Sequence, residues 1–214
     1  MAFIEIDHLT KKIKNDTVLQ DINLSCEKNR IYGFTGRNGS GKTMLFKAIA
    51  GLIQPTEGFI RIAGTQIGKE HAYPVSVGVM IENIGLWPYL SAMENLKVLA
   101  SIRHIVTKQD LVQVIKRVGL NPADKKPFGK FSLGMKQRLV LAQAIMEEPD
   151  LLILDEPTNA IDVDGVALFR QIVQEEKNRG ATILIASHSM DDFDTFCDNI
   201  YAIQEGVLYF DSEK

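Results

Sequence analysis

Two segments far apart in the chain carry residues suited to holding phosphate. The first, GRNGSGKT at residues 36–43, fits the pattern Gly-x-x-x-x-Gly-Lys-Thr between a predicted strand and a predicted helix. Its glycines let backbone N–H groups surround phosphates, Lys42 supplies a positive charge, and the Thr43 hydroxyl can ligate Mg²⁺. The second, FSLGMKQR at residues 131–138, places Ser132 and Gly134 where a helix begins, and free N–H groups there also favour an anion.

A third segment, DLLILDEPTNAID at residues 150–162, supplies carboxylates after an apolar strand. Asp155 ends that strand, and we expect it to hold magnesium through water. Glu156 follows directly, where a carboxylate can polarise an attacking water; general-base help of this kind is typically worth ~10²–10⁴-fold in rate. Together with the glycine loop, this segment predicts a nucleotide hydrolase.

The order of five motifs narrows the class of hydrolase. GRNGSGKT, FSLGMKQR, LLILDEPT, NAID and IASH, in that order, resemble the ATP-binding-cassette family over essentially the whole chain. The sequence has no Asn-Lys-x-Asp motif, which argues against a GTPase. The resemblance implies an α/β fold: a P-loop NTPase (RecA-like) core, an N-terminal antiparallel β subdomain and an inserted α-helical subdomain.

The resemblance also explains why the chain has two phosphate sites. Domains of this family pair head to tail, so ATP with Mg²⁺ lies between the phosphate loop of one copy and the signature segment of another. Ser132 and Gly134 would then close over the γ-phosphate held by a partner, with Asp162 at the dimer interface. The implied nucleotide contacts of this chain's own loop are Gly36, Asn38, Gly39, Ser40, Gly41, Lys42, Thr43 and Met44. The implied catalytic residues are Lys42, Glu156 and His188, of which His188 would contact the γ-phosphate. The implied metal-site residues are Thr43, Glu82 and Asp155.

Three departures from the family pattern are informative. The signature segment has Phe131, Leu133 and Met135 where Leu, Gly and Gln are usual, so the contacts of the glutamine are missing. Glu82 stands where the family has a glutamine that senses magnesium and water. Glutamate there, together with FSLGM, resembles the bacitracin and lantibiotic self-protection transporters; the alternative is a neutral change in some other exporter.

Ile13 is the third departure, because it stands where the family stacks an aromatic residue on adenine. Stacking on a base is worth ~1–3 kcal/mol in nucleic-acid complexes. An isoleucine keeps apolar contact and loses the π-face, so we predict weak selectivity for ATP over GTP.

The remaining function classes differ in their partners. The leading interpretation is an ATP-hydrolysing exporter subunit that works, by default as a homodimer, on a separate transmembrane permease at the inner face of the cell membrane. Trp87 and Tyr89 either pack locally or line a groove for a short helix of that permease. An alternative is a non-transport relative acting on ribosomes or DNA. A net charge of −3 and a pI near 5.8 argue against a nucleic-acid partner. A stand-alone P-loop kinase would leave FSLGM and His188 unexplained.

The elements that must position these residues follow an α/β pattern in a single domain. Strands are expected at 3–7, 18–26, 31–36, 58–64, 75–81, 151–155, 181–187 and 199–203, with a closing hairpin at 205–210. Helices are expected after Lys42, within 91–120, after Ser132, over 163–179 and after His188. Ser91 is a plausible N-cap with Glu94 completing a capping box. We expect the core at 1–85 and 146–214 and the helical subdomain at about 86–145. Cys26 and Cys197 have no metal-ligand spacing and are expected as reduced, buried thiols.

Overall fold

The strands form two sheets in the computed structural model, which describes residues 2–68, 73–81, 85–159, 161–188 and 196–213. The smaller sheet is antiparallel in the order β2-β1-β4-β5, and the larger has the order β10-β9-β3-β8-β7-β6. The smaller sheet consists of β1 (Ile4–Ile13), β2 (Asp16–Cys26), β4 (Glu57–Ile62) and β5 (Thr65–Gln66). The larger consists of β3 (Ile31–Thr35), β6 (Val77–Met80), β7 (Leu151–Asp155), β8 (Thr182–Ser187), β9 (Asn199–Gln204) and β10 (Val207–Glu213).

The larger sheet is parallel from β9 to β6, and β10 adds an antiparallel edge. Every residue of β3, β7 and β8 is buried, as expected for parallel strands covered on both faces. β3 lies between β8 and β9, although more than a hundred residues separate it from either in the sequence. The carboxyl ends of β3, β8 and β7 therefore meet at one edge, where α/β sheets bind ligands.

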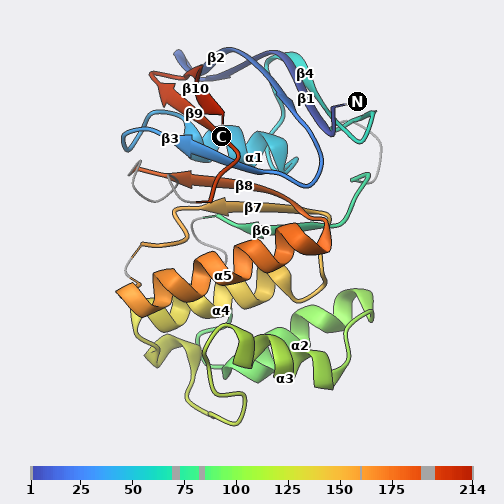
Figure 1. Cartoon of the computed structure of the whole chain (residues 1–214), viewed down its shortest axis with the longest axis vertical. Coiled ribbons are helices and arrows are strands. Elements are labelled where there is room, and N and C mark those ends of the chain that lie inside the picture. Colours follow the sequence, from blue (N-terminus) through green and yellow to red (C-terminus); the bar gives the residue numbers. More distant parts are fainter. Residues whose placement is uncertain (1, 69–72, 82–84, 160, 189–195, 214) are drawn as a thin grey trace.

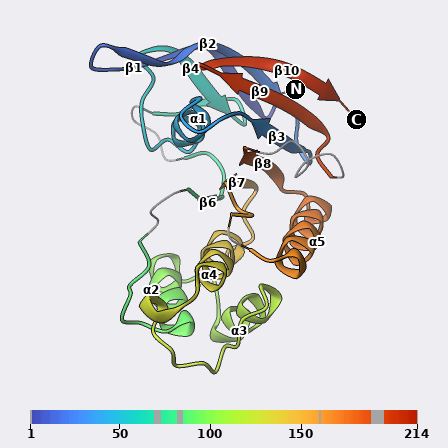
Figure 2. The same ribbon diagram turned by 90° about the vertical axis from the view of Figure 1, so that its left-hand side faces the viewer.

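The helices cover the two faces of this sheet unequally. One hydrophobic cluster joins α1 and the smaller sheet to one face, through Leu151 and Ile153 of β7. The other joins the remaining helices to the opposite face, through Leu152 and Leu154. Figure 2 shows α1 and α5 on opposite sides of β7 and β8, and Figure 1 shows α2 and α3 at the far end from the smaller sheet. The helices are α1 (Lys42–Ile49), α2 (Ala92–Arg103), α3 (Lys108–Arg117), α4 (Leu133–Ile145) and α5 (Val163–Arg179), with a 3-10 turn at Phe128–Lys130.

The structure confirms the predicted α/β architecture with an N-terminal antiparallel sheet and helices inserted between β6 and β7. Ser91 caps α2 in a complete capping box with Glu94, as predicted. β1 and β2 are longer than expected because a bulged hairpin extends their pairing to Ile13 and Asp16. The predicted division into core and helical subdomain stays a prediction. The helix expected after His188 falls on residues outside the described part, and no helix within that part combines the length and apolar character needed to cross a bilayer.

Candidate nucleotide-binding site

The phosphate loop connects β3 to α1, and its backbone leaves the first turn of α1 open. Gly41 is the N-cap, at a φ of +113° that favours glycine, and no side chain caps the helix. A Cβ on Gly36 would lie 2.4 Å from the carbonyl oxygen of Ile203, so the loop packs closely against the end of β9. The Ser40 hydroxyl is buried and makes no hydrogen bond to any described residue. Open N–H groups and an unpaired hydroxyl suit phosphate oxygens.

Lys42 is 5% exposed and its ammonium is held inside the loop. Nζ donates to the carbonyl oxygens of Gly36 at 2.6 Å and Arg37 at 3.2 Å. The same nitrogen lies 3.6 Å from Oε1 of Glu156. A positive charge in this position lies next to the open first turn of α1, where a phosphate would bind.

Thr43 and Asp155 lie together at the start of α1 and the end of β7. The Thr43 hydroxyl donates to Oδ2 of Asp155 at 2.5 Å. Hydroxyl and carboxylate oxygens are the ligands that Mg²⁺ takes, and this metal usually completes its shell with waters and substrate phosphates. The pair therefore fits magnesium bound with a nucleotide. Within the described residues, no cluster of three or more His, Cys, Asp and Glu could hold a metal ion alone.

Glu156 is positioned by the neighbouring strand β8. Its N–H donates to the carbonyl oxygen of Ala186 at 2.9 Å, and its φ is +49°, uncommon for a residue other than glycine. Its side chain is 15% exposed and Oε2 lies 2.9 Å from Nδ1 of His188, which follows β8. An acid and an imidazole are thus hydrogen-bonded beside the phosphate loop.

A hollow of about 560 Å³ contains most of the predicted nucleotide contacts. Its lining residues are Thr17, Val18, Asn38, Gly39, Ser40, Gly41, Lys42, Thr43, Met44, Glu156, Glu205 and Gly206. Gly36 and Ile13 are outside this lining. Ile13 ends β1 and is 42% exposed, opposite Asp16 in the hairpin that continues into Thr17 and Val18.

Sequence reasoning missed the rim formed by Thr17, Val18, Glu205 and Gly206. The β9–β10 turn packs on the phosphate loop, because the N–H of Gly206 donates to the carbonyl oxygen of Ser40 at 2.9 Å. The carbonyl oxygen of Gly206 accepts from the N–H of Gln20 at 2.8 Å. Only Gly206 gave a sequence signal for this turn, because Glu205 and Gly206 both have positive φ and such a turn favours glycine.

Ser132, Gly134 and Asp162 are also outside the lining of this hollow. Ser132 is the N-cap of α4 and accepts from the N–H of Met135 at 3.3 Å. Asp162 is the N-cap of α5 and accepts from the N–H of Gly165 at 2.9 Å. Both predicted contacts with a second nucleotide therefore begin helices. Glu82 lies outside the described residues.

A larger hollow of about 770 Å³ lies elsewhere, between α3 and the turn after α4. Its lining mixes apolar residues with both signs of charge, including Asp110, Lys116 and Glu148. None of the predicted site residues lies there. Although this hollow is the larger of the two, it is not the nucleotide site, because neither the phosphate loop nor the carboxylates of Asp155 and Glu156 line it.

Comparison with known proteins decides the family. A family model described as ABC transporter matches residues 19–159. The chain belongs to the ABC transporter family. It is 52% identical to the ABC transporter ATP-binding protein YybJ of Bacillus subtilis (strain 168), over 96% of this chain and 94% of that protein. This membership confirms the interpretation as an ATP-binding, ATP-hydrolysing transporter subunit and favours it over a kinase or an ATPase acting on ribosomes or DNA.

Two further relatives of this cassette have named transport roles. The bacitracin transport ATP-binding protein BcrA of Enterococcus faecalis is 41% identical, over 96% of this chain and 67% of that protein. The lantibiotic transport ATP-binding protein SrtF of Streptococcus pyogenes is 35% identical, over 98% of this chain and 90% of that protein.

A solved structure shares the fold. The dimeric, ADP- and Pi-bound post-hydrolysis structure of the ATP-binding cassette MJ0796 has a TM-score of 0.89, 20% identity and 98% coverage of both chains. This likeness confirms the fold predicted for the ABC cassette.

Proposed function

We propose that this cassette drives an exporter of peptide antibiotics or similar amphipathic compounds, as a head-to-tail dimer on a separate membrane subunit. The observation that carries the mechanism is the joining of Lys42, Glu156 and His188 by contacts of 3.6 Å and 2.9 Å beside the open end of α1. Glu156 and His188 directly follow β7 and β8, and Lys42 begins α1 after the loop that leaves β3; the parallel sheet brings the ends of these three strands to one edge.

Nucleotide binding uses the phosphate loop and its rim. The N–H groups of Gly41, Lys42 and Thr43 at the uncapped start of α1 and the unpaired Ser40 hydroxyl surround the phosphates, while the N–H of Ser40 donates to the carbonyl oxygen of Arg37 at 3.1 Å. Lys42 exchanges its bonds to loop carbonyls for bonds to phosphate oxygens. The nucleoside extends toward Thr17 and Val18, which line the same hollow. Ile13, at the nearby end of the hairpin, offers apolar contact to the base without a ring to stack on.

Magnesium would be held by Thr43 and Asp155, with Glu82 facing it or kept away until the site closes. When bound, the metal neutralises charge that develops on the phosphate oxygens. The carboxylate of Asp155 and the hydroxyl of Thr43 are already oriented, because each fixes the other through their hydrogen bond. The contribution of Thr43 and Asp155 to metal binding is therefore the fixed orientation of their oxygen atoms.

Hydrolysis depends on Glu156 as general base toward the attacking water. Its carboxylate sits between Lys42 and His188, which hold it in one orientation. Binding of the γ-phosphate draws Lys42 toward the phosphate, which leaves Glu156 to polarise water. His188 would keep its bond to Glu156 and sense the γ-phosphate through Nε2, which must then carry a proton because phosphate oxygens accept hydrogen bonds.

The second phosphate site acts on the nucleotide of a partner copy. The N-terminus of α4, with Ser132 and Gly134, would close over the partner's γ-phosphate, because a helix N-terminus carries partial positive charge. Asp162 would lie beside the partner's phosphate loop. ATP then joins two copies, and hydrolysis separates them.

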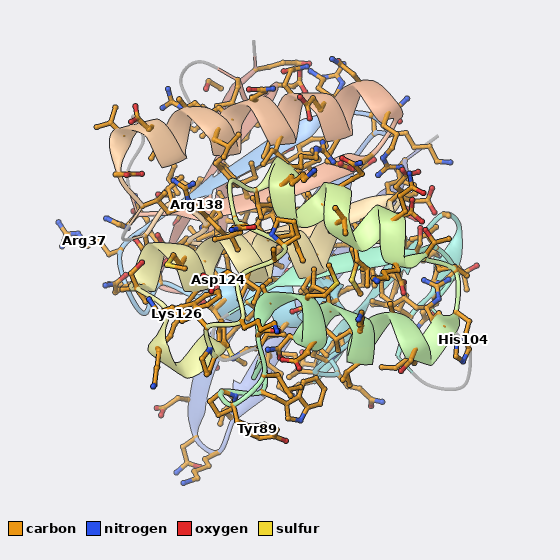
Figure 3. The ribbon with its side chains drawn as sticks, turned by 90° about the horizontal axis from the view of Figure 1, so that it is seen from below. Arg37, Tyr89, His104, Asp124, Lys126 and Arg138 are labelled. Atoms are coloured by element: carbon orange, nitrogen blue, oxygen red, sulfur yellow. The ribbon has the colours of Figure 1, made fainter. Side chains whose placement is uncertain are left out.

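The permease would dock near Trp87 and Tyr89. The backbone of Trp87 is fixed to buried Asn95, which donates to its carbonyl oxygen and accepts from its N–H. Tyr89, by contrast, is 70% exposed, and Figure 3 shows it at the surface next to the helices. An exposed aromatic ring on a fixed loop suits an interface anchor. Such docking would place the cassette on the cytoplasmic face of the membrane.

Dimer formation is tested first, through the solution mass of Glu156→Gln by light scattering with and without Mg-ATP. Removing the base should trap ATP, so the mass should double only with ATP. Lys42→Ala in the same background should stay monomeric. A Glu156→Gln protein that binds ATP and stays monomeric would contradict the homodimer.

The cargo class is tested in cells that lack the gene and carry complementing copies. Cells with the unaltered chain should grow at higher bacitracin or lantibiotic concentrations than cells with Lys42→Ala. Arg103→Gln, an exposed ion-pair residue away from the nucleotide hollow, is the matched control and should complement fully. Equal sensitivity of all three strains would argue against peptide antibiotics as cargo.

A further inference from the structure

We infer that Arg138 is a positioning residue that locks the segment preceding α5 to the signature helix α4, so that Ser132 and Asp162 move as one unit. The inference rests on the proposed head-to-tail dimer, in which both residues reach a partner's nucleotide. Figure 3 shows Arg138 between α4 and α5.

The contact between Arg138 and Asp162 joins two helices at their working ends. Nη2 of Arg138 donates to Oδ1 of Asp162 at 3.3 Å. The same oxygen accepts from the N–H of Gly165 and so caps α5. One carboxylate oxygen therefore fixes the start of α5 and holds it to α4.

Two glycines make room for the guanidinium group. A Cβ on Gly119, at the end of α3, would lie 2.5 Å from Nη1 of Arg138. A Cβ on Gly165, in the first turn of α5, would lie 3.1 Å from Nη2 and 2.7 Å from Oδ1 of Asp162. Gly165 stands in a helix, where glycine is a poor choice on propensity alone. Gly119 also has a φ of +75°, which favours glycine, and a Cβ on Gly165 would come closest to Cγ2 of Ile161, at 2.0 Å. Arg138 and Asp162 are thus among the close neighbours that leave no room for a side chain at Gly165.

Arg138 also lies on the helix that carries the second phosphate site. Ser132 is the N-cap of α4, six residues before Arg138, or about 9 Å along the helix axis. A helix transmits a shift of one end to the other. Arg138 thus connects the predicted γ-phosphate contact at Ser132 with the predicted interface residue Asp162, through a single side chain.

Stability does not explain this arrangement. The side chain of Asp162 is 72% exposed and that of Arg138 is 24% exposed. Exposed ion pairs contribute little to folding stability. The contact instead restricts geometry, since the guanidinium is planar and is confined between two glycines and a carboxylate.

The first test measures ATP-driven dimerisation in the Glu156→Gln background. Arg138→Gln should weaken association by about tenfold to a hundredfold, the scale of an ångström-size misplacement. Gly165→Ala should also weaken association, but its Cβ would lie 2.0 Å from Cγ2 of Ile161 and 2.7 Å from Oδ1 of the N-cap Asp162, so it should lower the thermal midpoint as well. For Arg138→Gln, the ATP affinity of the dilute monomer and the thermal midpoint should stay unchanged. Arg103→Gln, which breaks an exposed Arg–Glu pair at 2.8 Å elsewhere on the helices, should associate normally.

Mixed dimers separate positioning from a general structural defect. One copy carries Lys42→Ala, so a single nucleotide site remains, formed by the intact loop and the signature segment of the Lys42→Ala copy. Arg138→Gln should reduce trapped ATP by about tenfold when it is in that Lys42→Ala copy. It should have no effect when it is in the copy with the intact loop. A fold defect would reduce both arrangements equally.

The outcomes are distinguishable. If Glu156→Gln alone fails to dimerise with ATP, the proposed dimer is wrong and the inference falls with it. If Glu156→Gln dimerises and Arg138→Gln dimerises as tightly, the proposed function stands and the positioning role is overturned. Equal losses in both mixed arrangements also overturn it.

Discussion

Oε2 of Glu156 lies 2.9 Å from Nδ1 of His188, and this hydrogen bond joins the residue after β7 to the residue after β8. An ionised carboxylate can only accept, so Nδ1 is the donor. The bond therefore needs a proton on Nδ1, and because phosphate oxygens accept hydrogen bonds, His188 could bind one at the same time only if Nε2 also carries a proton. Phosphate sensing by His188 would depend on that second nitrogen.

Loss of the His188 ring should slow hydrolysis and spare binding. His188→Ala should lower the rate of phosphate release about a hundredfold, because Glu156 loses the partner that orients it. The dissociation constant for ATP, measured by fluorescence titration, should change less. His104→Ala is the matched control, since His104 is exposed at the end of α2. An unchanged rate in His188→Ala would rule out this role.

Thr43 should set the magnesium requirement. Thr43→Val removes the hydroxyl that meets Asp155 at 2.5 Å, so half-maximal hydrolysis should need about tenfold more Mg²⁺. Thr43→Ser keeps the hydroxyl and should restore the normal requirement. Thr35→Val removes a buried hydroxyl that donates to the carbonyl oxygen of Tyr201, and it should leave the magnesium titration unchanged. A normal titration for Thr43→Val would contradict metal binding at this pair.

An aromatic residue at position 13 should create base selectivity. The unaltered chain should bind GTP nearly as well as ATP, and Ile13→Tyr should tighten nucleotide binding by ~1–3 kcal/mol with a preference for adenine. Competition titrations of ATP against GTP measure both quantities. Ile105→Tyr, which changes another exposed isoleucine, should have no effect. A strong preference for ATP over GTP in the unaltered chain would contradict this prediction.

The capping box of α2 should make stability depend on pH. Ser91→Ala should lower the free energy of unfolding at pH 7 by about 1 kcal/mol, because the N-cap bond to the N–H of Glu94 is lost. Hydrogen bonds from Ser91 also hold the pKa of Glu94 below its usual range. A carboxylate with a lowered pKa in the folded state stabilises above the pKa of the unfolded chain, and the effect disappears as pH falls through the folded value.

Glu94→Gln should therefore destabilise the protein more at pH 7 than at pH 3, because the stabilisation by the charged carboxylate is lost as pH falls through its lowered pKa. Urea unfolding at both pH values checks this, with Glu148→Gln, another exposed glutamate, as the control. A loss of equal size at both pH values would mean that the charge of Glu94 is not involved.

The sequence was informative wherever one local pattern determines one local structure. The glycine loop before Lys42 and the cap at Ser91 depend on residues that are neighbours in the chain. The buried strands β7 and β8 could be predicted because a parallel strand covered on both faces is apolar throughout. Thr107 and Asp110 form a second capping box, which was not predicted because the usual pattern has Glu or Gln at the last position.

The sequence did not predict the contacts between segments that lie far apart in the chain. Thr17, Val18 and Glu205 border the nucleotide hollow only because β2 and the β9–β10 turn pack against the phosphate loop. None of these residue types indicates a nucleotide contact. The space around Arg138 could not be predicted either, since it depends on Gly119, which follows α3, and Gly165, which lies in α5.

The position of β3 also governs when the site can form during synthesis. Its neighbours in the sheet are β8 and β9, and the loop that follows it is held by Gly206. A growing chain therefore makes its phosphate loop early and acquires the partners of that loop last. Until Gly206 has left the ribosome, the loop lacks the hydrogen bond by which the β9–β10 turn holds Ser40.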